Sequence, residues 1–361
     1  MYMFMRILFI RNFISKKISK IKNALNNPLQ IIFIQVAHLA NRNLARKNFK
    51  LSIGVRAQVP IIFKNNIDDF STEEYAVIFH GKIFDNLVEE FLFSNISAFR
   101  STYPKLMIVL SSYVGDFVNL NRFLDLNVEF IDNVDVGQLQ EPFPTSLCQQ
   151  IETIGHGLMA AEQAKKRYSL KIRVDQSVSP ENILRLLSGH FDLFPSGLET
   201  VSRIFTSSYG TYRHRPLGLS DMFMFGETKY LLAFWKPAHP VEYVETAKYL
   251  REKFREPLWN GFLIPEVWLA ARYLDHLGLD LSSPGFSTTH AWSVYFGVID
   301  SSAIDLVWYK THEWLDSNYL TRVWFSSDFH PEMGELRFAD WLSSYFLTGS
   351  RKRETAIFPG V

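Results

Sequence analysis

The feature that most constrains the fold is an alternation of short apolar runs with longer amphipathic stretches that begins at Tyr75. Three such short runs span residues 75–79, 105–110 and 128–131, and residues 169–174 form a further predicted strand. Between them, apolar side chains recur at helical spacing, at Leu87, Val88, Phe91, Leu92, Ile96 and Phe99 and again at Leu147, Ile151, Ile154, Leu158 and Ala161. Strands that alternate with helices form mostly parallel sheets covered on both faces. We therefore predict an α/β fold over residues 71–361, with a mostly parallel sheet flanked by helices.

Polar residues follow the predicted strands at the place where such sheets bind ligands, the crevice beyond the carboxyl ends of the strands. These candidates for a binding site are His80, Gly81, Lys82, Ser111, Ser112, Asp132, Asp135, Lys171, Arg173, Asp175 and Gln176.

Asp175 is the central candidate. The two-residue period of a strand puts Lys171, Arg173 and Asp175 on one side of the chain. An acid flanked by basic residues suits a diphosphate that is bridged by a metal or clamped by an arginine. A salt-bridged strand end without a catalytic role is the alternative.

Three later segments carry further candidates. Arg213 and Arg215 lie in a basic loop over residues 210–218, which either closes over phosphates or is an ordinary surface loop. Asp221 stands at the start of an apolar strand that ends at Gly226. Its carboxylate either binds an acceptor hydroxyl or fixes a loop through local hydrogen bonds to the backbone. Glu266 stands at a helix start and either stabilises the helix terminus or takes a proton from an acceptor hydroxyl.

The charge of the chain is divided between a basic N-terminal arm and an acidic remainder. Residues 1–67 hold 12 Lys and Arg and no acid, whereas the rest holds 26 Lys and Arg against 37 acids. Apolar residues recur at helical spacing among the lysines, at Ile10, Ile14, Ile18, Ile21 and Leu25. Such a helix lies on an anionic membrane, packs as a cap on the acidic body or binds nucleic acid. We predict that residues 1–70 form a membrane-binding amphipathic arm. We expect no nucleic-acid partner, because stacking aromatic residues do not recur regularly in the arm.

Composition and absent motifs narrow the classes of protein that remain. The single cysteine, Cys148, forms no internal disulfide and no zinc site of Cys/His spacing, which favours a reducing, cytoplasmic location. No run of about 18 apolar residues occurs, and Arg6 and Arg11 interrupt the apolar N-terminus, so we expect neither a transmembrane helix nor a secretory signal. The motifs of P-loop kinases, Rossmann dehydrogenases, zincins and α/β-hydrolases are absent from the sequence.

Taken in order, the strand-end motifs resemble the WavE-type lipopolysaccharide synthesis family over roughly residues 75–279. The matching pieces are Ala76-Val-Ile-Phe-His-Gly-Lys82, Leu106-Met-Ile-Val-Leu-Ser-Ser112, Asp132-x-x-Asp135-x-Gly137, Gly157-Leu158, Lys171-Ile-Arg-Val-Asp175, Ser220-Asp-Met-Phe-Met-Phe-Gly226 and Pro265-Glu266.

The resemblance implies a bacterial glycosyltransferase with a GT-A-like fold that uses a nucleotide-sugar donor. The implied acceptor is a lipid-linked lipopolysaccharide core or surface polysaccharide at the inner face of the cytoplasmic membrane, where the arm binds peripherally. Glu266 and Asp221 would be the catalytic residues that face this acceptor. The donor would be bound by His80, Gly81, Lys82, Ser111, Asp132, Asp135, Lys171, Arg173, Asp175, Arg213 and Arg215.

Many enzymes of the GT-A type hold a divalent metal on the diphosphate with a D-x-D pair. Arg173 occupies the first acid position in this sequence. Either Asp175 therefore holds Mn²⁺ or Mg²⁺ with water and phosphate ligands, or Arg173 replaces the metal as a cationic clamp; we predict the metal. Two other functions stay open, a capsular sugar-phosphate transferase and a catalytically inactive, membrane-peripheral saccharide-binding assembly protein.

Overall fold

The computed structural model describes residues 71–116, 120–134, 145–181, 183–196, 201–213, 215–236, 240–254, 258–259, 262–308 and 335–357. The chain divides into two units, Met1–Ile67 and Asp68–Val361, and the described residues belong to the second. The predicted arm over residues 1–70 and the candidate Asp135 lie outside the described residues and stay predictions. Among the helices in the described ranges, none is long and apolar enough to cross a membrane.

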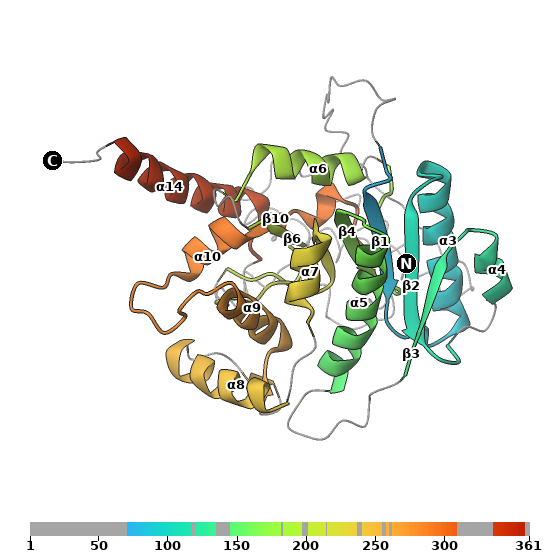
Figure 1. Ribbon diagram of the computed structural model, residues 1–361, viewed down its shortest axis with the longest axis horizontal. Helices are drawn as coiled ribbons and strands as arrows, with labels where there is room; N and C mark the ends of the chain where they lie inside the picture. Colours follow the sequence, from blue (N-terminus) through green and yellow to red (C-terminus); the bar gives the residue numbers. More distant parts are fainter. Residues whose placement is uncertain are drawn as a thin grey trace, which may run out of the picture. The chain divides into compact units, whose positions relative to one another are not determined.

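Within the described residues, seven strands form one sheet in the order β10-β6-β7-β4-β1-β2-β3 (Figure 1). These strands are β1 (Tyr75–His80), β2 (Met107–Tyr113), β3 (Glu129–Asn133), β4 (Tyr168–Arg173), β6 (Ile204–Ser207), β7 (Phe223–Glu227) and β10 (Phe296–Ile299). β1 is parallel to β2 and β4, β2 is parallel to β3, and β10 is parallel to β6. β7 is antiparallel to both of its neighbours. The prediction of a mostly parallel α/β sheet is confirmed.

The reversal of β7 brings a further residue to the edge where the parallel strands end. Because β7 runs against β4 and β6, its amino end lies at the same edge as the carboxyl ends of the strands beside it. Asp221 precedes β7, whereas His80 and Arg173 end β1 and β4. All three therefore lie toward one edge of the sheet.

The helices and the short strands complete the described fold. The helices are α3 (Asn86–Thr102), α4 (Leu120–Leu124), α5 (Thr145–Gln163), α6 (Ile183–Leu193), α7 (Thr228–Phe234), α8 (Pro240–Phe254), α9 (Pro265–His276), α10 (Thr288–Tyr295), the 3₁₀ turn η2 (Ser301–Ala303) and α14 (Phe338–Ile357). The short strands pair as β5 (Gln176–Ser177) with β11 (Val307–Trp308), and as β8 (Leu258–Trp259) with β9 (Phe262–Leu263).

Helices cover both faces of the sheet. On one face, Phe99 of α3 packs edge-on against Phe79 of β1, with ring centroids 5.8 Å apart. Ile78 points to the opposite face, where α5 approaches so closely that a Cβ at Gly157 would lie 2.5 Å from the Ile78 side chain. α7 lies beside α5 on this second face (Figure 1). The central strands are therefore buried on both sides, which explains the apolar run of β1.

Two strand boundaries differ from the sequence-based expectation in ways that affect the site. β2 continues through Ser111 to Tyr113, because these residues pair with β3. β4 ends at Arg173, and Val174 and Asp175 form a turn that leads into β5. The prediction that Asp175 continues the alternation of the strand was therefore wrong, although the residue does lie at the strand end.

The C-terminal helix α14 packs on α10 and β10 through a buried tryptophan. The Trp341 side chain is fully buried, and its Nε1 donates to the carbonyl oxygens of Trp292 at 3.0 Å and Phe296 at 2.9 Å. Trp341 is therefore a core residue.

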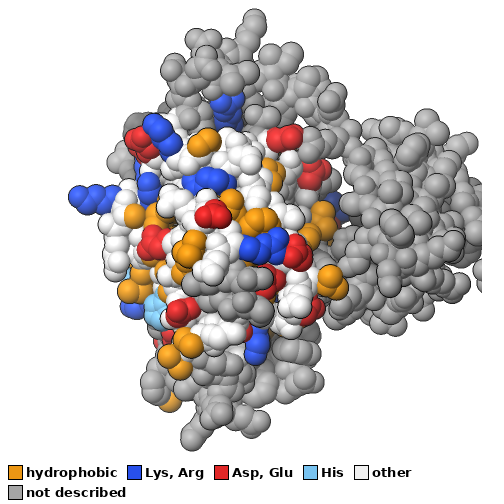
Figure 2. Space-filling model, turned by 90° about the vertical axis from the view of Figure 1, so that its right-hand side faces the viewer, with side chains coloured by type: hydrophobic (Ala, Val, Ile, Leu, Met, Phe, Trp, Pro, Cys, Tyr) orange, Lys and Arg blue, Asp and Glu red, His pale blue; other side chains and the backbone are white. Residues whose placement is uncertain are grey.

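Charges of both signs are mixed on the described surface. On the face that Figure 2 shows, the coloured Lys and Arg side chains alternate with Asp and Glu side chains. The described part of this face therefore presents a mixed surface, although acids outnumber bases in the sequence after Ile67.

Candidate active site

The register of the central strands lines up the first group of candidate side chains. His80 of β1 is opposite Ser111 of β2 and Arg173 of β4. Partners in a parallel pair face the same side of the sheet, and Lys171, two residues before Arg173, faces that side as well. These four candidates therefore lie on one face of three adjacent strands, the face covered by α5 and α7.

Arg173 and Asp175 form a two-point ion pair. Arg173 donates from Nε to Oδ1 of Asp175 at 2.8 Å and from Nη2 to Oδ2 at 3.0 Å. The Asp175 side chain is 1% exposed, whereas that of Arg173 is 22% exposed. Burial by itself lowers the pKa of Arg173, but the hydrogen bonds and charge of Asp175 outweigh it and raise the pKa above its ordinary value. The guanidinium is therefore permanently charged, fixed in orientation and still partly open to solvent.

Trp308 forms a further hydrogen bond to the Asp175 carboxylate. Its Nε1 donates to Oδ2 of Asp175 at 3.0 Å, and its ring centroid lies 5.8 Å from the Arg173 guanidinium carbon. The antiparallel pairing of β11 with β5 brings it there, because Trp308 is opposite Gln176 in that pair. The Tyr209 ring meets the indole edge-on, with centroids 6.2 Å apart.

His80 is a buried, neutral side chain. Its Nδ1 lies 3.3 Å from the hydroxyl of Thr153 on α5, and its Nε2 has no hydrogen-bond partner among the described residues. Burial, followed by the charges of Lys171 and Arg173, lowers the pKa of His80 well below its ordinary value. The imidazole is therefore uncharged at neutral pH and contributes no cation to the site.

Lys171 is fully buried in the same layer. Its Nζ lies 5.1 Å from the centroid of the Trp235 ring at the end of α7. Burial lowers the pKa of Lys171 to about 7; the charges of Asp221, Asp175 and Glu266 oppose this effect, and that of Arg173 adds to it.

The two candidate acids Asp221 and Glu266 act on one another. Glu266 is the second residue of α9, and Asp221 is 9% exposed just before β7. Burial is the main cause that raises the pKa of Glu266 to about 7, and the negative charge of Asp221 adds to it. The charges of Arg215 and Lys171 lower it in turn. A carboxyl that titrates near neutral pH suits a general base.

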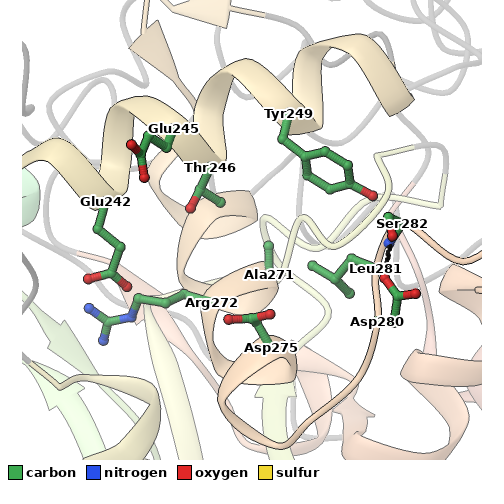
Figure 3. A pocket seen from close by; sticks show the side chains of 10 residues that line it. All are labelled: Glu242, Glu245, Thr246, Tyr249, Ala271, Arg272, Asp275, Asp280, Leu281 and Ser282. Atoms are coloured by element: carbon green, nitrogen blue, oxygen red, sulfur yellow. Dashed lines mark hydrogen bonds between the residues drawn. The ribbon is translucent and has the colours of Figure 1, made fainter.

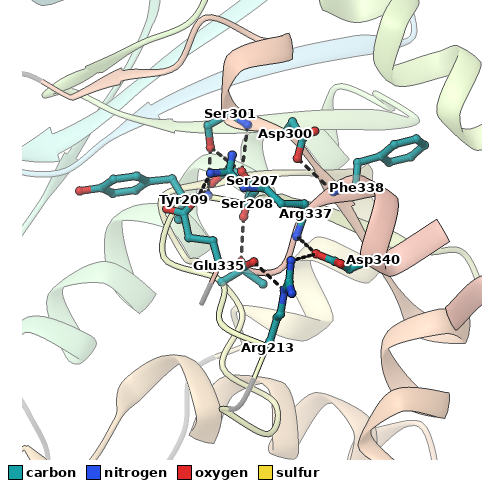
Figure 4. A network of polar contacts seen from close by, with 11 residues as sticks. Ser207, Ser208, Tyr209, Arg213, Asp300, Ser301, Glu335, Arg337, Phe338 and Asp340 are labelled. Carbon is teal, nitrogen blue, oxygen red and sulfur yellow. Dashed lines mark hydrogen bonds and ion pairs between the residues drawn. The ribbon is translucent and has the colours of Figure 1, made fainter. Parts of the chain in front are cut away.

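Arg213 and Arg215 diverge, although they are neighbours in the basic loop. Arg213 turns toward α14, where its Nη2 lies 2.7 Å from Oδ2 of Asp340 and its Nε donates to the Glu335 carbonyl (Figure 4). Arg215 lies over the Tyr212 ring, with its guanidinium carbon 4.5 Å from the centroid. Its charge reaches Glu266, so only Arg215 of this pair joins the strand-end acids in the described arrangement.

Hydrogen bonds to residues of β2 fix the loop that follows β1. Gly81 adopts φ +111°, which only glycine accepts without strain, and its N–H donates to the Ser111 carbonyl at 3.1 Å. Ser112 donates to the Gly81 carbonyl or to Asp116, each at 2.8 Å. The adjoining Lys82 is exposed. The loop therefore presents backbone close to the strand ends, and Lys82 reaches outward.

The end of β3 carries Asp132, whose role in donor binding stays a prediction, and Asn133. Asp132 is exposed, whereas the buried neighbour Asn133 donates to Ser111 Oγ at 2.9 Å and meets His156 Nδ1 at 2.6 Å. Sequence reasoning missed Asn133, because a shift of one residue exchanges the faces of a strand.

The described residues fit a metal at Asp175 poorly. Both oxygens of Asp175 already accept N–H groups, from Arg173 and Trp308. In the described ranges, no group of three or more His, Cys, Asp and Glu side chains has an arrangement that would hold a metal ion. The donor set at Asp175 fits a guanidinium better than a metal, and the metal stays a prediction.

Two cavities in the described part of the chain lie away from this cluster. One, of about 290 Å³ between α8 and α9, is lined by Glu242, Glu245, Thr246, Tyr249, Ala271, Arg272, Asp275, Asp280, Leu281 and Ser282 (Figure 3). The other, of about 120 Å³, lies beside Arg213 and Trp341. The strand-end charges are not among the residues that line them.

Comparisons with known proteins leave the family open. No protein-family model matches the chain, and no curated protein matches it. A solved structure of a cytidylyltransferase from Leptospira borgpetersenii serovar Hardjo-bovis is 12% identical over 50% of this chain and 74% of its own, with a TM-score of 0.31. A glycosyltransferase involved in the glycosylation of the major capsid of PBCV-1 is 11% identical over 63% of this chain and 81% of its own, with a TM-score of 0.32. Neither likeness identifies a family or an activity at these values.

Proposed function

We propose that the protein is a glycosyltransferase that moves a sugar from a nucleotide-sugar donor to a saccharide acceptor. The observation that carries the proposal is the gathering of Arg173, Asp221 and Glu266 toward one edge of a mostly parallel sheet, with Lys171 buried two residues before Arg173. Ligands of such sheets bind beyond this edge. Cations suit a diphosphate, and a carboxyl that titrates near pH 7 suits the activation of a hydroxyl.

On the donor side, Arg173 is the clamp for the diphosphate. Its guanidinium keeps a donor on Nη1 after Nε and Nη2 have bonded to Asp175. Asp175 and Trp308 orient this group, so little side-chain freedom is lost when the diphosphate binds. Gly81 and Lys82 border the nucleotide. We propose the guanidinium of Arg173 in place of the metal that the sequence predicts at Asp175.

On the acceptor side, Glu266 is the base and Asp221 helps to orient the hydroxyl. In an inverting transfer, the acceptor oxygen forms a bond to the anomeric carbon while Glu266 takes its proton. The bond from that carbon to the diphosphate oxygen breaks, and the nucleoside diphosphate leaves with the electron pair. The charge that develops on its oxygens is stabilised by the fixed guanidinium of Arg173.

The acceptor class and location are further parts of the proposal. The motif resemblance to the WavE-type family supports a lipid-linked lipopolysaccharide core or surface polysaccharide as acceptor. The basic amphipathic pattern of residues 1–70 supports peripheral binding to the anionic inner face of the cytoplasmic membrane. Sedimentation with anionic vesicles at low salt tests this part. The intact chain should sediment, and a chain without residues 1–70 should stay in solution; equal sedimentation of both contradicts it.

The activity is tested by incubation of the intact chain with radiolabelled nucleotide sugars and lipid-linked saccharides extracted from bacterial membranes. The proposal predicts one labelled product that gains a single sugar residue by mass. Glu266→Gln should abolish it, whereas Glu162→Gln, at the far end of α5, should not. A product with a new phosphodiester would instead identify a sugar-phosphate transferase. No product from any donor would count for the inactive saccharide-binding alternative.

A further inference from the structure

Lys171 is a lysine in the middle of the sheet. It stands opposite Ile78 on β1 and Met224 on β7, and its side chain is 0% exposed. Its Nζ reaches no hydrogen-bond partner among the described residues, and no ion pair within 4.0 Å is seen for it there. A buried ammonium without a partner is unfavourable, so its protonated form needs a counter-charge that this part of the fold does not place in contact.

The charges around Lys171 come from several elements. Arg173 lies on its own strand, Asp175 in the turn that follows, Asp221 before β7 and Glu266 at the start of α9. His80 on β1 is neutral. α7 contributes the uncharged ring of Trp235, and α5 faces this part of the sheet with Gly157 and Thr153.

The nearby acids do not neutralise Lys171 fully. Asp175 raises the pKa of Lys171, but Asp175 is also paired with Arg173, whose positive charge lowers that pKa. Burial therefore outweighs the acids, and the pKa of Lys171 falls to about 7. In the ligand-free protein, the side chain is thus mostly uncharged above neutral pH.

We propose that Lys171 takes up a proton from solvent when a nucleotide-sugar diphosphate binds at Arg173. The inference rests on the proposed function, because it takes the diphosphate as the missing counter-charge. No covalent bond changes; a proton moves from the buffer to the Nζ lone pair. Donor binding should then weaken as the pH rises above neutral, since each binding event must bring a proton.

Calorimetry of donor binding measures this proton directly. A panel of UDP-, GDP-, CMP- and ADP-sugars is titrated into the intact chain at pH 8 in buffers of different ionisation enthalpy. The diphosphate diester of the UDP-, GDP- and ADP-sugars does not titrate near this pH, so the proton count reports the protein. We expect uptake approaching about one proton per bound donor in the wild type.

Matched variants separate Lys171 from other groups that titrate near neutral pH. Lys171→Met keeps the length and apolar volume of the side chain and should bind with uptake near zero; Lys171→Gln gives a second variant if methionine packs badly. Glu266→Gln should retain uptake, which excludes Glu266 as the source. Lys248→Met, on the exposed part of α8, is the charge control and should behave as wild type.

A second measurement needs no donor. The unfolded chain keeps lysine near its ordinary pKa of about 10.4, above the folded value for Lys171. Between these values the unfolded state binds more protons, so the contribution of Lys171 to stability rises with pH. The difference in unfolding free energy between wild type and Lys171→Met should therefore shift in favour of the wild type from pH 7 to pH 10, and a constant difference would overturn the inference.

The outcomes distinguish the inference from the function on which it rests. Donor binding with equal proton uptake in wild type and Lys171→Met, or with none in either, would refute the role of Lys171 and leave the glycosyltransferase proposal intact. Failure of every nucleotide sugar to bind would contradict both. Uptake that disappears only in the Lys171 variants would support the inference.

Discussion

The indole N–H of Trp308 donates a 3.0 Å hydrogen bond to Oδ2 of Asp175, a residue 133 positions earlier in the chain. Arg173 binds the same carboxylate from the other side through two hydrogen bonds. The orientation of Arg173, a charged and partly open side chain at the end of β4, thus depends on β11. We expect Trp308 to be a positioning residue for the donor clamp.

Replacement of Trp308 by phenylalanine should lower both stability and donor affinity. The variant keeps an aromatic ring but loses a hydrogen bond to a charged acceptor, which costs about 1.5–3 kcal/mol of unfolding free energy. The KM for the donor should rise because Arg173 is less well fixed. Chemical denaturation and donor kinetics measure the two effects.

Trp341→Phe is the matched control for this experiment. It loses hydrogen bonds to two backbone carbonyls in the core beneath α14 and should destabilise the protein by about 1 kcal/mol without a change in donor KM. An equal KM change in the two tryptophan variants would show that Trp308 acts through general stability alone.

Arg173→Lys should damage donor use although the charge is kept. An ammonium cannot reproduce the planar, two-point pairing with Asp175 or present a fixed third donor to the diphosphate. We expect kcat/KM for the donor to fall by about 10–100-fold, a loss of about 1.4–2.8 kcal/mol. Steady-state kinetics with the purified chain check this, and near-wild-type kcat/KM would remove the clamp from the mechanism.

Chelation should leave the reaction intact. Asp175 already accepts three N–H groups, and Arg173 supplies the positive charge that a metal would bring. Initial rates should therefore be the same with EDTA as with added Mn²⁺ or Mg²⁺. A rate that vanishes with EDTA and returns with Mn²⁺ would instead support the predicted metal at Asp175.

Glu266 should give the pH profile of kcat/KM its acidic limb. Burial, with the charge of Asp221, raises the pKa of Glu266 to about 7, so activity should fall as the pH drops below 7 and the base gains a proton. Glu266→Gln should lose about 10²–10⁴-fold in rate and lack this limb. A wild-type profile that is flat from pH 5 to pH 8 argues against Glu266 as the base.

The same residue makes a prediction about stability that needs no substrate. Its folded pKa lies above the unfolded value of about 4.3, so the folded state binds more protons between these values. The stability that Glu266 contributes is therefore complete below pH 4.3 and is lost as the pH rises through about 7. The difference in unfolding free energy between wild type and Glu266→Gln should follow this trend, whereas a pH-independent difference would count against the raised pKa of this half-buried carboxyl.

The sheet was predictable because its central strands are buried on both faces. Strands of this kind are rich in apolar residues, as β1 and the first half of β2 are, and helical stripes flank them; β4 is buried as well but carries Lys171 and Arg173. The direction of β7 was not predictable, since an apolar run that is buried on both faces looks the same in either direction. Pairing with β4 and β6, which are distant in sequence, decides it.

The site was predictable only in part, for a related reason. The sequence predicts His80, Lys171 and Arg173 as site residues because they lie in or near the ends of predicted strands. It predicts Glu266 because this residue lies at the start of a predicted helix. Trp308 reaches Asp175 only through the β5–β11 pair, and the turn of Arg213 toward Asp340 depends on the packing of α14. Contacts between distant segments leave no local pattern in the sequence.

Donor binding tests the central claim most directly. The intact chain, Arg173→Met and the control Arg122→Met, at a half-buried arginine on α4, are titrated with the nucleotide-sugar panel by calorimetry in the presence of EDTA. The account predicts that at least one nucleotide sugar binds the wild type and the control alike and that Arg173→Met loses at least about tenfold in affinity, which is about 1.4 kcal/mol. Absence of binding by every nucleotide sugar, or equal binding by Arg173→Met, would contradict it.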